Sequence, residues 1–355
     1  MKKIALLPVA ALLMLGACSN DDPVVRPVPN DPVQTVPSVA DHITLNAPAQ
    51  AEVKAEGSYF RVSYANGQEI VYSLVNSSSL GYVATVKKIQ GSAADVIVPA
   101  SVNYNERTFT VNSLDIMLEG IDDTVTSLTF PNTITQLVDN SIFANLTSDY
   151  FRAQMERGNK VESINLEEGF PNFCSIDGAV YSADLQTLVC VPRGYKGTMT
   201  VAEDTKFIAP RALYYCSQID VLTLPAGIVS IGDEAVVFND NLLLINCLAT
   251  TAPEAVSGAF GQYAHNGVLR IPAGAEDAYK FTKPDMALPI EPTEPAMPGA
   301  DATDDDWTAF DEAYAEYEVA MGEYYAALNE YNEVNEYYDS HEGWVYFKNV
   351  EGVNF

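Results

Sequence analysis

The amino-acid sequence predicts a mainly β protein, in which short strands stack as a solenoid between an N-terminal β-cap and a long α-helix inserted near the C-terminus. Three patterns support this fold class. Pairs of apolar residues at i and i+2 recur about every 23 residues, two β-rich runs flank an Asn-Gly pair, and aromatic residues follow a heptad spacing over 304–339. We expect a signal peptide at 1–17, a tether at 18–40, the β-cap and first rung at 41–120, the repeats at 121–280, a linker plus helix at 281–342, and a terminal segment at 343–355.

The composition argues against one class of partner. Lys and Arg number 19 against 48 Asp and Glu, which gives the 355-residue chain a net charge of −29. Nucleic-acid phosphates require a basic face, so we expect no nucleic-acid partner. A hydrophobic content of 48% is enough for a large buried core, and an acidic surface indicates mainly solubility.

The first residues have the pattern of an exported lipoprotein. Lys2 and Lys3 precede an apolar run of 12 residues, which is too short for a bilayer that needs about 20, so we expect a signal peptide. The sequence LGAC that ends at Cys18 resembles a bacterial lipobox, which implies cleavage before Cys18 and acylation of its thiol. The SNDD that follows is similar to the surface-export signal of Bacteroidetes lipoproteins. We therefore expect an outer-membrane lipoprotein exposed at the cell surface, with periplasmic exposure as the alternative.

A stiff tether and then a β-cap are expected before the repeats. Five prolines between 23 and 37 fix φ and donate no hydrogen bond, which predicts an extended tether. Further on, Asn66-Gly67 lies between two β-rich runs and predicts a hairpin with a type I′ turn. We interpret this hairpin as part of a cap that shields the open edge of the first rung.

Seven apolar pairs predict the rungs. The pairs are Val96/Val98, Leu128/Phe130, Ile164/Leu166, Met199/Val201, Leu222/Leu224, Ile245/Cys247 and Leu269/Ile271. The later pairs are 23 or 24 residues apart and the earlier ones 32 to 36, so longer loops separate the earlier rungs. Proline follows four of these strands and ends them. Because side chains alternate along a strand, we expect Leu224 to face the core and Thr223 to point outward.

The repeated phrases resemble a known family. LTFPNTITQLVDNSIFA from Leu128 and LTLPAGIVSIGDEAVVF from Leu222 are similar to the BspA-like leucine-rich repeats of bacterial surface proteins. The stretches 173–194, 268–280 and 343–350 are similar to the inserted hairpin, the closing rung and the terminal segment of those proteins. The resemblance implies a leucine-rich-repeat solenoid that acts in binding or adhesion.

The cysteines do not form a metal or redox motif. Cys174, Cys190, Cys216 and Cys247 lack the C-x-x-C spacing of such sites. Cys216 occupies a repeat position that holds Asn239 and Asn145 in other rungs, so we expect it to donate a hydrogen bond to a loop backbone. Cys174 and Cys190 could form a disulfide, which the sequence leaves open.

Catalytic and metal-binding patterns are weak. His42, His265 and His341 lie in separate segments, so no Ser/Cys-His-acid arrangement has an evident centre and we expect no enzyme. A calcium-loop register would place Asp301, Thr303, Asp305 and Glu312 at its ligand positions, but Asp306 stands where the loop needs Gly. We instead expect Thr303 or Asp304 to cap a helix, and we expect no metal or cofactor.

That helix is the most unusual segment. A Pro-rich linker at 281–300 leads into it, and residues 301–342 hold 14 acids and no Lys or Arg. The two heptad rows are Phe310, Tyr317, Tyr324, Tyr331, Tyr338 and Trp307, Tyr314, Met321, Leu328. Such a stripe predicts a long amphipathic helix that either docks on a partner or packs on the chain's own rungs.

The expected function is that of a lipid-anchored surface module that binds a protein or glycan on a host or neighbouring cell. The candidate binding residues are the helix tyrosines, Tyr314, Tyr317, Tyr324, Tyr331 and Tyr338, and the outward-facing Thr223 and Asn246 of the concave face. One alternative is an accessory subunit of an outer-membrane uptake or assembly complex, with the helix as its docking element. A surface glycan hydrolase that uses two of the many carboxylates is the least favoured alternative.

Overall fold

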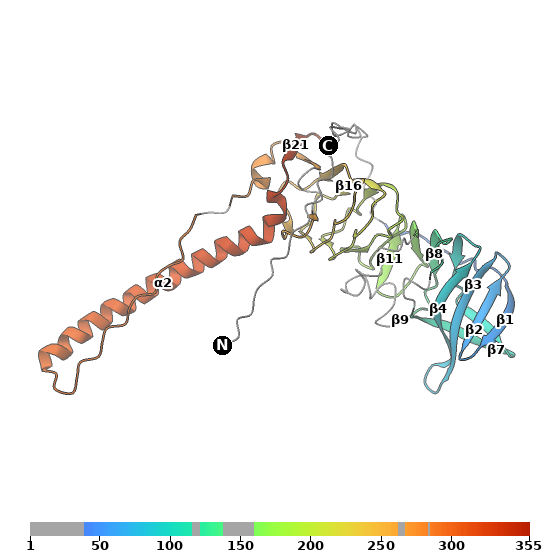
Figure 1. Ribbon diagram of the computed structural model, residues 1–355, viewed down its shortest axis with the longest axis horizontal. Coiled ribbons are helices and arrows are strands. Elements are labelled where there is room, and N and C mark those ends of the chain that lie inside the picture. The colour runs from blue at the N-terminus through green and yellow to red at the C-terminus, as the bar shows by residue number, and fades with distance from the viewer. Residues whose placement is uncertain (1–38, 116–120, 138–159, 262–266, 283–284) are drawn as a thin grey trace, which may run out of the picture.

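A computed structural model describes residues 39–115, 121–137, 160–261, 267–282 and 285–355. Figure 1 shows three parts in a row: an N-terminal sheet, a stack of strands, and a long C-terminal helix that projects from the stack. The chain is mainly β with one long helix near its C-terminus, as predicted. The signal peptide, Cys18, nearly all of the tether, Ser141, Asn145 and His265 lie outside the described residues.

The N-terminal sheet has the order β1-β2-β3-β4-β7-β6, with β9 paired to β7. Its strands are β1 (Gln50–Glu56), β2 (Tyr59–Tyr64), β3 (Gln68–Ser77), β4 (Gly81–Gly91), β6 (Ser101–Tyr104), β7 (Arg107–Leu114) and β9 (Gln136–Leu137). The predicted hairpin is present, because β2 and β3 pair antiparallel across Asn66-Gly67. The predicted type I′ turn is wrong. Three residues separate the strands, and only Gly67 has a positive φ, of 88°, which fits a three-residue loop that ends in one left-handed residue.

Parallel strands form the stack. One sheet has the order β10-β8-β5 and comprises β5 (Asp95–Ile97), β8 (Ser127–Phe130) and β10 (Ser163–Leu166). A second has the order β14-β16-β18-β20-β21 and comprises β14 (Gly197–Thr200), β16 (Ile219–Leu224), β18 (Leu244–Cys247), β20 (Val268–Pro272) and β21 (Asn349–Val353). Met199 pairs with Leu222, Leu222 with Ile245, and Ile245 with Leu269. Neighbouring strands therefore pair residue by residue at the predicted spacing.

A third sheet contains the predicted hairpin at 173–194. It has the order β11-β12-β13-β15-β17-β19. Its strands are β11 (Phe173–Ile176), β12 (Ala179–Ser182), β13 (Thr187–Cys190), β15 (Phe207–Ile208), β17 (Ser230–Ile231) and β19 (Glu254–Ala255). The first three pair antiparallel and the last three continue in parallel. Leu222 and Leu224 are buried in the core between these sheets, as their alternation predicted, and Ile231 and Ala235 are buried with them.

Two glutamine side chains make strand-like hydrogen bonds, and one of them, Gln68, joins the N-terminal sheet to the stack. Gln68 is fully buried, and its amide donates to the Ile97 carbonyl at 2.7 Å and accepts from the Ile97 N–H at 3.0 Å. Its side chain therefore replaces a neighbouring strand at the open edge of β5. Gln50 forms the same pair of bonds with Asn103 and links the two edge strands, β1 and β6, of the N-terminal sheet.

The long helix is an insertion between two neighbouring strands. After β20 the chain forms a short 3-10 helix, η4 (Glu276–Tyr279), then an extended segment and helix α2 (Asp304–Val345), and returns as β21 beside β20. Thr303 is the N-cap of α2 and forms a capping box with Asp306. The calcium-loop alternative is wrong, because Asp305 and Glu312 lie on the helix. No helix in the described part of the chain combines the length and apolar character needed to span a membrane.

Candidate functional site

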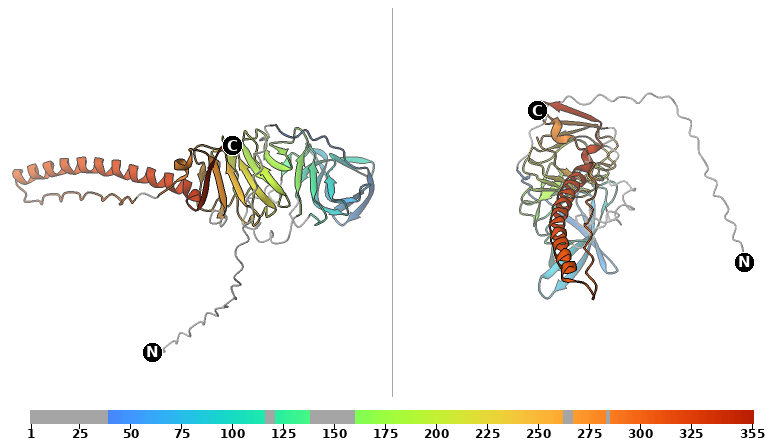
Figure 2. Two further views of the ribbon diagram at one scale, coloured as in Figure 1. Left: turned by 90° about the horizontal axis from the view of Figure 1, so that it is seen from above. Right: turned by 90° about the vertical axis from the view of Figure 1, so that its left-hand side faces the viewer.

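We call residues 285–342 the arm. It consists of a Pro-rich segment, residues 285–302, and the helix from Asp304 to Glu342. We call the N-terminal sheet and the stacked strands together the body. The figures show the segment running outward along α2 and the helix returning to the body (Figures 1 and 2). At about 3.1 Å per residue in extended polyproline form the segment spans about 56 Å. Helical residues 304–341, at about 1.5 Å each, span about 57 Å, so the segment matches the helix in length.

The predicted tyrosines lie together on one face of α2. Tyr314, Tyr317, Tyr324, Tyr331 and Tyr338 are all half-buried, whereas most other arm residues of the helix are exposed. The Tyr314 and Tyr317 rings lie 5.7 Å apart, and the Phe310 and Tyr314 rings are also 5.7 Å apart. The heptad spacing therefore identified a real stripe. We call these five tyrosines with Phe310, Met321 and Leu328 the tyrosine stripe.

The Pro-rich segment is the feature that runs alongside this stripe. Between 285 and 300 its half-buried residues are Met286, Pro289, Pro292, Pro295 and Pro298, which recur every third position while the residues between them are exposed. Burial at every third residue is the pattern of a polyproline II helix, which has three residues per turn. Burial, Glu294 and Glu291 raise the pKa of Tyr317, so the two elements lie within electrostatic range.

This arrangement differs from both sequence alternatives. The half-burial of the stripe and of every third residue of the Pro-rich segment, which runs along the helix, indicates that these two faces of the arm lie against each other. The stripe does not pack on the stacked strands, because the arm projects away from them (Figure 2). The sequence signal for this arrangement is the proline at every third position from 289 to 298, a period that the expectation of a simple linker leaves out.

The root of the helix is anchored in the body. Trp344 is buried, and its indole N–H donates to the Pro253 carbonyl at 2.6 Å. Its ring contacts Phe260 at 4.8 Å and Tyr279 at 5.3 Å between centroids. Gly343 is also buried and leaves no room for a side chain, because an added Cβ would lie 2.7 Å from the Val256 carbonyl oxygen. The helix therefore enters the core at β19 through these two residues.

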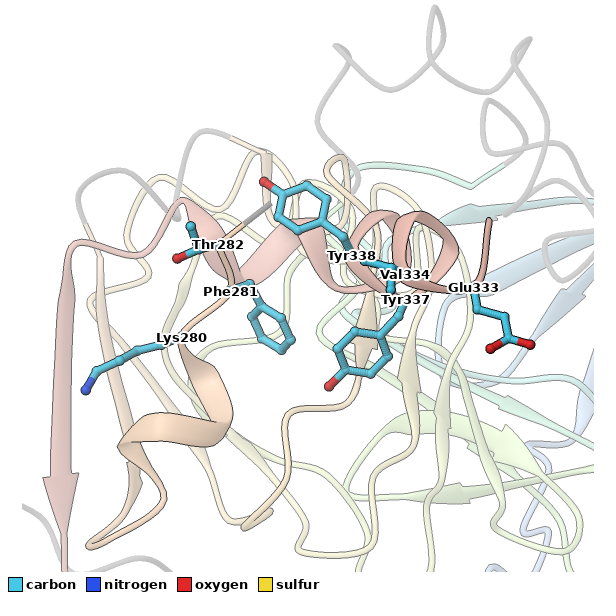
Figure 3. Close-up of a pocket in the computed structure, with 7 residues that line it drawn as sticks. All are labelled: Lys280, Phe281, Thr282, Glu333, Val334, Tyr337 and Tyr338. Atoms are coloured by element: carbon cyan, nitrogen blue, oxygen red, sulfur yellow. The ribbon is translucent and has the colours of Figure 1, made fainter. Parts of the chain in front are cut away.

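A pocket lies beside the root of the arm. We call it the root pocket; its volume is about 350 Å³ and its lining is Lys280, Phe281, Thr282, Glu333, Val334, Tyr337 and Tyr338. In Figure 3 the Phe281 and Tyr337 rings lie next to each other and point to the same side, while Lys280 and Glu333 extend at opposite ends. The two rings are 6.1 Å apart, and Phe281 also stacks on His341 at 5.0 Å. Of these residues, only Tyr338 was a binding candidate from the sequence, and His341 was one of its three histidines.

The arm is strongly acidic. Residues 285–342 contain 17 Asp and Glu and no Lys or Arg. Three of these acids, Asp304, Asp305 and Asp306, occupy the first turn of α2, where the helix dipole favours negative charge. Within the described residues, no three His, Cys, Asp or Glu side chains converge as a metal site.

The other two predicted binding residues are not accessible. Thr223 and Asn246 are only 2% and 6% exposed, so the expectation that they display a concave binding face is wrong. They lie opposite each other on β16 and β18, and the Asn246 amide donates to the Thr223 hydroxyl at 3.2 Å. Neighbouring strands lie about 4.8 Å apart, so side chains at paired positions cover each other. This burial depends on the neighbouring strand and does not show in the sequence of one strand.

The four described cysteines are free thiols. Cys174 and Cys190 lie on β11 and β13, with β12 between them, and do not form the disulfide that the sequence left open. Cys216 donates to the Val191 carbonyl at 3.5 Å, as predicted for its repeat position. In Asn239, the equivalent residue, neither side-chain polar atom meets a hydrogen-bond partner among the described residues. Burial raises the pKa of Cys190 to about 12, which keeps its thiol protonated and unreactive.

The chain is similar in structure to bacterial proteins of low sequence identity. No family model matches the sequence, and no curated protein matches it. The pneumococcal vaccine antigen PcpA is similar in structure at 12% identity and a TM-score of 0.26, over 61% of this chain and 94% of that chain. A leucine-rich repeat protein from Eubacterium ventriosum is similar at 12% identity and a TM-score of 0.27, over 63% of this chain and 78% of that chain. A leucine rich cell surface protein from Faecalibacterium prausnitzii is similar at 14% identity and a TM-score of 0.25, over 62% of this chain and 55% of that chain. TM-scores below 0.5 carry no argument about fold or activity, so the resemblance to BspA-like repeats stays a prediction.

Proposed function

We propose that this protein is a binding module of the bacterial cell envelope, in which a repeat body presents the arm to a protein partner. The observation that carries the proposal is the position of the arm between β20 and β21. These strands pair directly with each other, so the body gains nothing in its strand ladder from the intervening residues. An element of this length that projects from the body and shares few contacts with it serves contact with something else.

The finer parts of the proposal concern the body and its anchor. We infer that the body is a leucine-rich-repeat solenoid, which the 23-residue offset of the parallel strand registers supports. We also infer that lipid on Cys18 attaches the chain to the outer membrane with the arm outside the cell, which the LGAC and SNDD sequences support. A Cys18→Ser variant should then leave the membrane fraction.

The arm also fits the accessory-subunit alternative. An acidic, aromatic projection beside a folded body suits docking within an envelope complex as well as adhesion to another cell. The identity of the captured protein separates these two: an outer-membrane transporter or assembly component indicates the accessory role, and a protein of a host or neighbouring cell indicates adhesion.

Deletion of the arm tests the proposal. The stacked rings of Phe281 and His341 show that the two ends of the excised segment lie close together, so a short Gly-Ser linker can replace 285–341. We expect the melting temperature to change by only a few degrees, because the anchor at Gly343 and Trp344 remains. Cross-linking on intact cells, followed by mass spectrometry, should identify a protein partner with the full chain and lose it with the deletion variant.

Two results would contradict the proposal. A partner that is captured equally by both chains would place the binding site on the body. A large fall in melting temperature would mean that the arm stabilises the body. The Tyr325→Ala variant is the control, because it changes one exposed aromatic residue outside the root pocket and should capture the partner normally.

A further inference from the structure

We infer that the root pocket binds a proline-rich, basic segment of a partner protein in extended conformation. This inference rests on the proposed function, because it names the chemistry of the partner that the arm would bind. It follows from the size and lining of the pocket, from the way the same helix already packs against prolines, and from the charge around the pocket.

The size and lining suit a short stretch of peptide. A volume of about 350 Å³ lies at the lower end of ligand pockets, and its walls are mainly apolar: Phe281, Val334, Tyr337 and Tyr338. Tyr337 is 57% exposed, so its ring is accessible to a ligand. Proline rings pack well on aromatic side chains, and an extended proline-rich chain loses little conformational entropy on binding.

The packing within the arm provides a model for the occupant. The tyrosine stripe of α2 lies along a segment with proline at every third position, and Tyr338 belongs to both the stripe and the root pocket. The pocket therefore continues, at the root end of the helix, a surface that already accommodates prolines. Aromatic-lined grooves that bind proline-rich peptides rely on the same chemistry.

The charge around the pocket selects a basic segment. Glu333 lies in its lining, and Glu330 and Glu336 occupy the adjacent turns of α2. Among the described lining residues Lys280 is the single cation, and its ammonium group pairs with Asp277 at 2.8 Å. The Pro-rich segment of a second copy contains Asp285, Glu291 and Glu294 and would be repelled. A Lys- or Arg-containing partner is favoured, most strongly at low ionic strength.

The test uses a synthetic peptide of repeated Pro-Pro-Arg units and the full chain with Cys18→Ser. Fluorescence anisotropy measures binding, and a Gly-Ser-Arg peptide of equal length and charge is the control ligand. We expect the proline peptide to bind more tightly. Tyr337→Ala should weaken its binding by about tenfold or more, and Tyr337→Phe should largely retain it. Tyr325, also 57% exposed and on the same helix but outside the pocket, gives the matched control Tyr325→Ala, which should bind normally.

Several results would overturn the inference. Equal binding of the two peptides would mean that charge alone attracts them. Equal effects of Tyr337→Ala and Tyr325→Ala would remove the pocket from the interaction. Loss of binding in Tyr317→Ala would mean that the peptide displaces the arm's own prolines. Self-association that disappears in Tyr337→Ala would identify a second copy as the occupant. Circular dichroism would verify that each variant keeps α2 folded.

The two proposals can fail separately. If arm deletion abolishes capture of the cellular partner but the proline peptide does not bind, the inference fails and the proposed function stands. If arm deletion leaves capture unchanged, the proposed function fails, and with it the role of the pocket in that function.

Discussion

The hydrogen bond between Asn246 and Thr223 joins neighbouring strands of the stack on the side opposite Leu222 and Leu224. Both side chains are buried, so the Thr223 hydroxyl is an internal acceptor. Removing it would leave the Asn246 amide without this partner in a site with little access to water. A buried donor that loses its acceptor costs about 1–3 kcal/mol.

We predict that Thr223→Ala lowers the free energy of unfolding by about 1–3 kcal/mol and Leu224→Ala by about 2–5 kcal/mol. The first removes an acceptor for a buried amide, and the second leaves a cavity in the core. Denaturant midpoints measure both. A double-mutant cycle with Asn246→Ala should give a coupling energy of about 0.5 kcal/mol or more. A cost near zero for Thr223→Ala would mean that the side chain is solvated.

Individual residues show what the sequence could and could not predict. Alternation along a strand predicted that Leu224 is buried, because that property depends on one strand and its apolar pattern. The same alternation predicted the face of Thr223 but not its burial, which depends on Asn246 in the neighbouring strand β18. Likewise, the Asn-Gly pair predicted the hairpin, whereas the turn type depended on where the strands stop pairing.

At the scale of elements, α2 is held to the body by a contact without space for a side chain. An added Cβ on Gly343 would lie 2.7 Å from the Val256 carbonyl oxygen and 2.8 Å from that of Ala255. Both atoms belong to the backbone near β19, so neither can rotate away. Gly322 lies in the same helix, and a Cβ there would meet nothing within 4 Å.

We predict that Gly343→Ala destabilises the chain by about 1–3 kcal/mol, because the helix root must shift away from β19. Gly322→Ala is the matched control and should stabilise the helix by up to about 1 kcal/mol, since alanine favours a helix over glycine. Chemical denaturation followed by circular dichroism measures both. Equal effects of the two substitutions would contradict the close packing at the root.

The sequence predicted one boundary of α2 and missed the other. The heptad pattern and the two cap candidates, Thr303 and Asp304, predicted its start to within one residue, because capping is local chemistry. The predicted end at 339 was too early, since the helix continues to Val345 where Trp344 enters the core. The sequence did not predict that the Pro-rich segment lies along the tyrosine stripe, because a linker and a packed polyproline segment share the same composition and differ only in periodicity.

At the scale of the whole molecule, the arm extends well beyond the strands. Figure 2 shows α2 and its Pro-rich segment continuing the long axis of the body. The sequence predicted that this segment interrupts the closing rung and the terminal strand. It did not predict the direction, because no pattern within the helix specifies the angle at which Trp344 anchors it.

We predict that replacing 285–341 with a short linker reduces the maximum dimension in small-angle X-ray scattering by about 50 Å, the length of the helix removed. The measurement requires dilute protein, because association would hide the change. An unchanged maximum dimension would mean that the arm folds back along the body in solution.

The close run of α2 beside its proline segment also restricts how the arm can change in length. Seven helical residues rise about 10.5 Å, and three polyproline residues rise about 9.3 Å. Removing one heptad therefore leaves about one proline triplet without a counterpart. Insertions and deletions would be tolerated in matched units, seven residues on one side with three on the other. An arm that evolved or was redesigned under this rule would lengthen in steps of about 10 Å, and the number of proline triplets would set the length of helix that they can accompany.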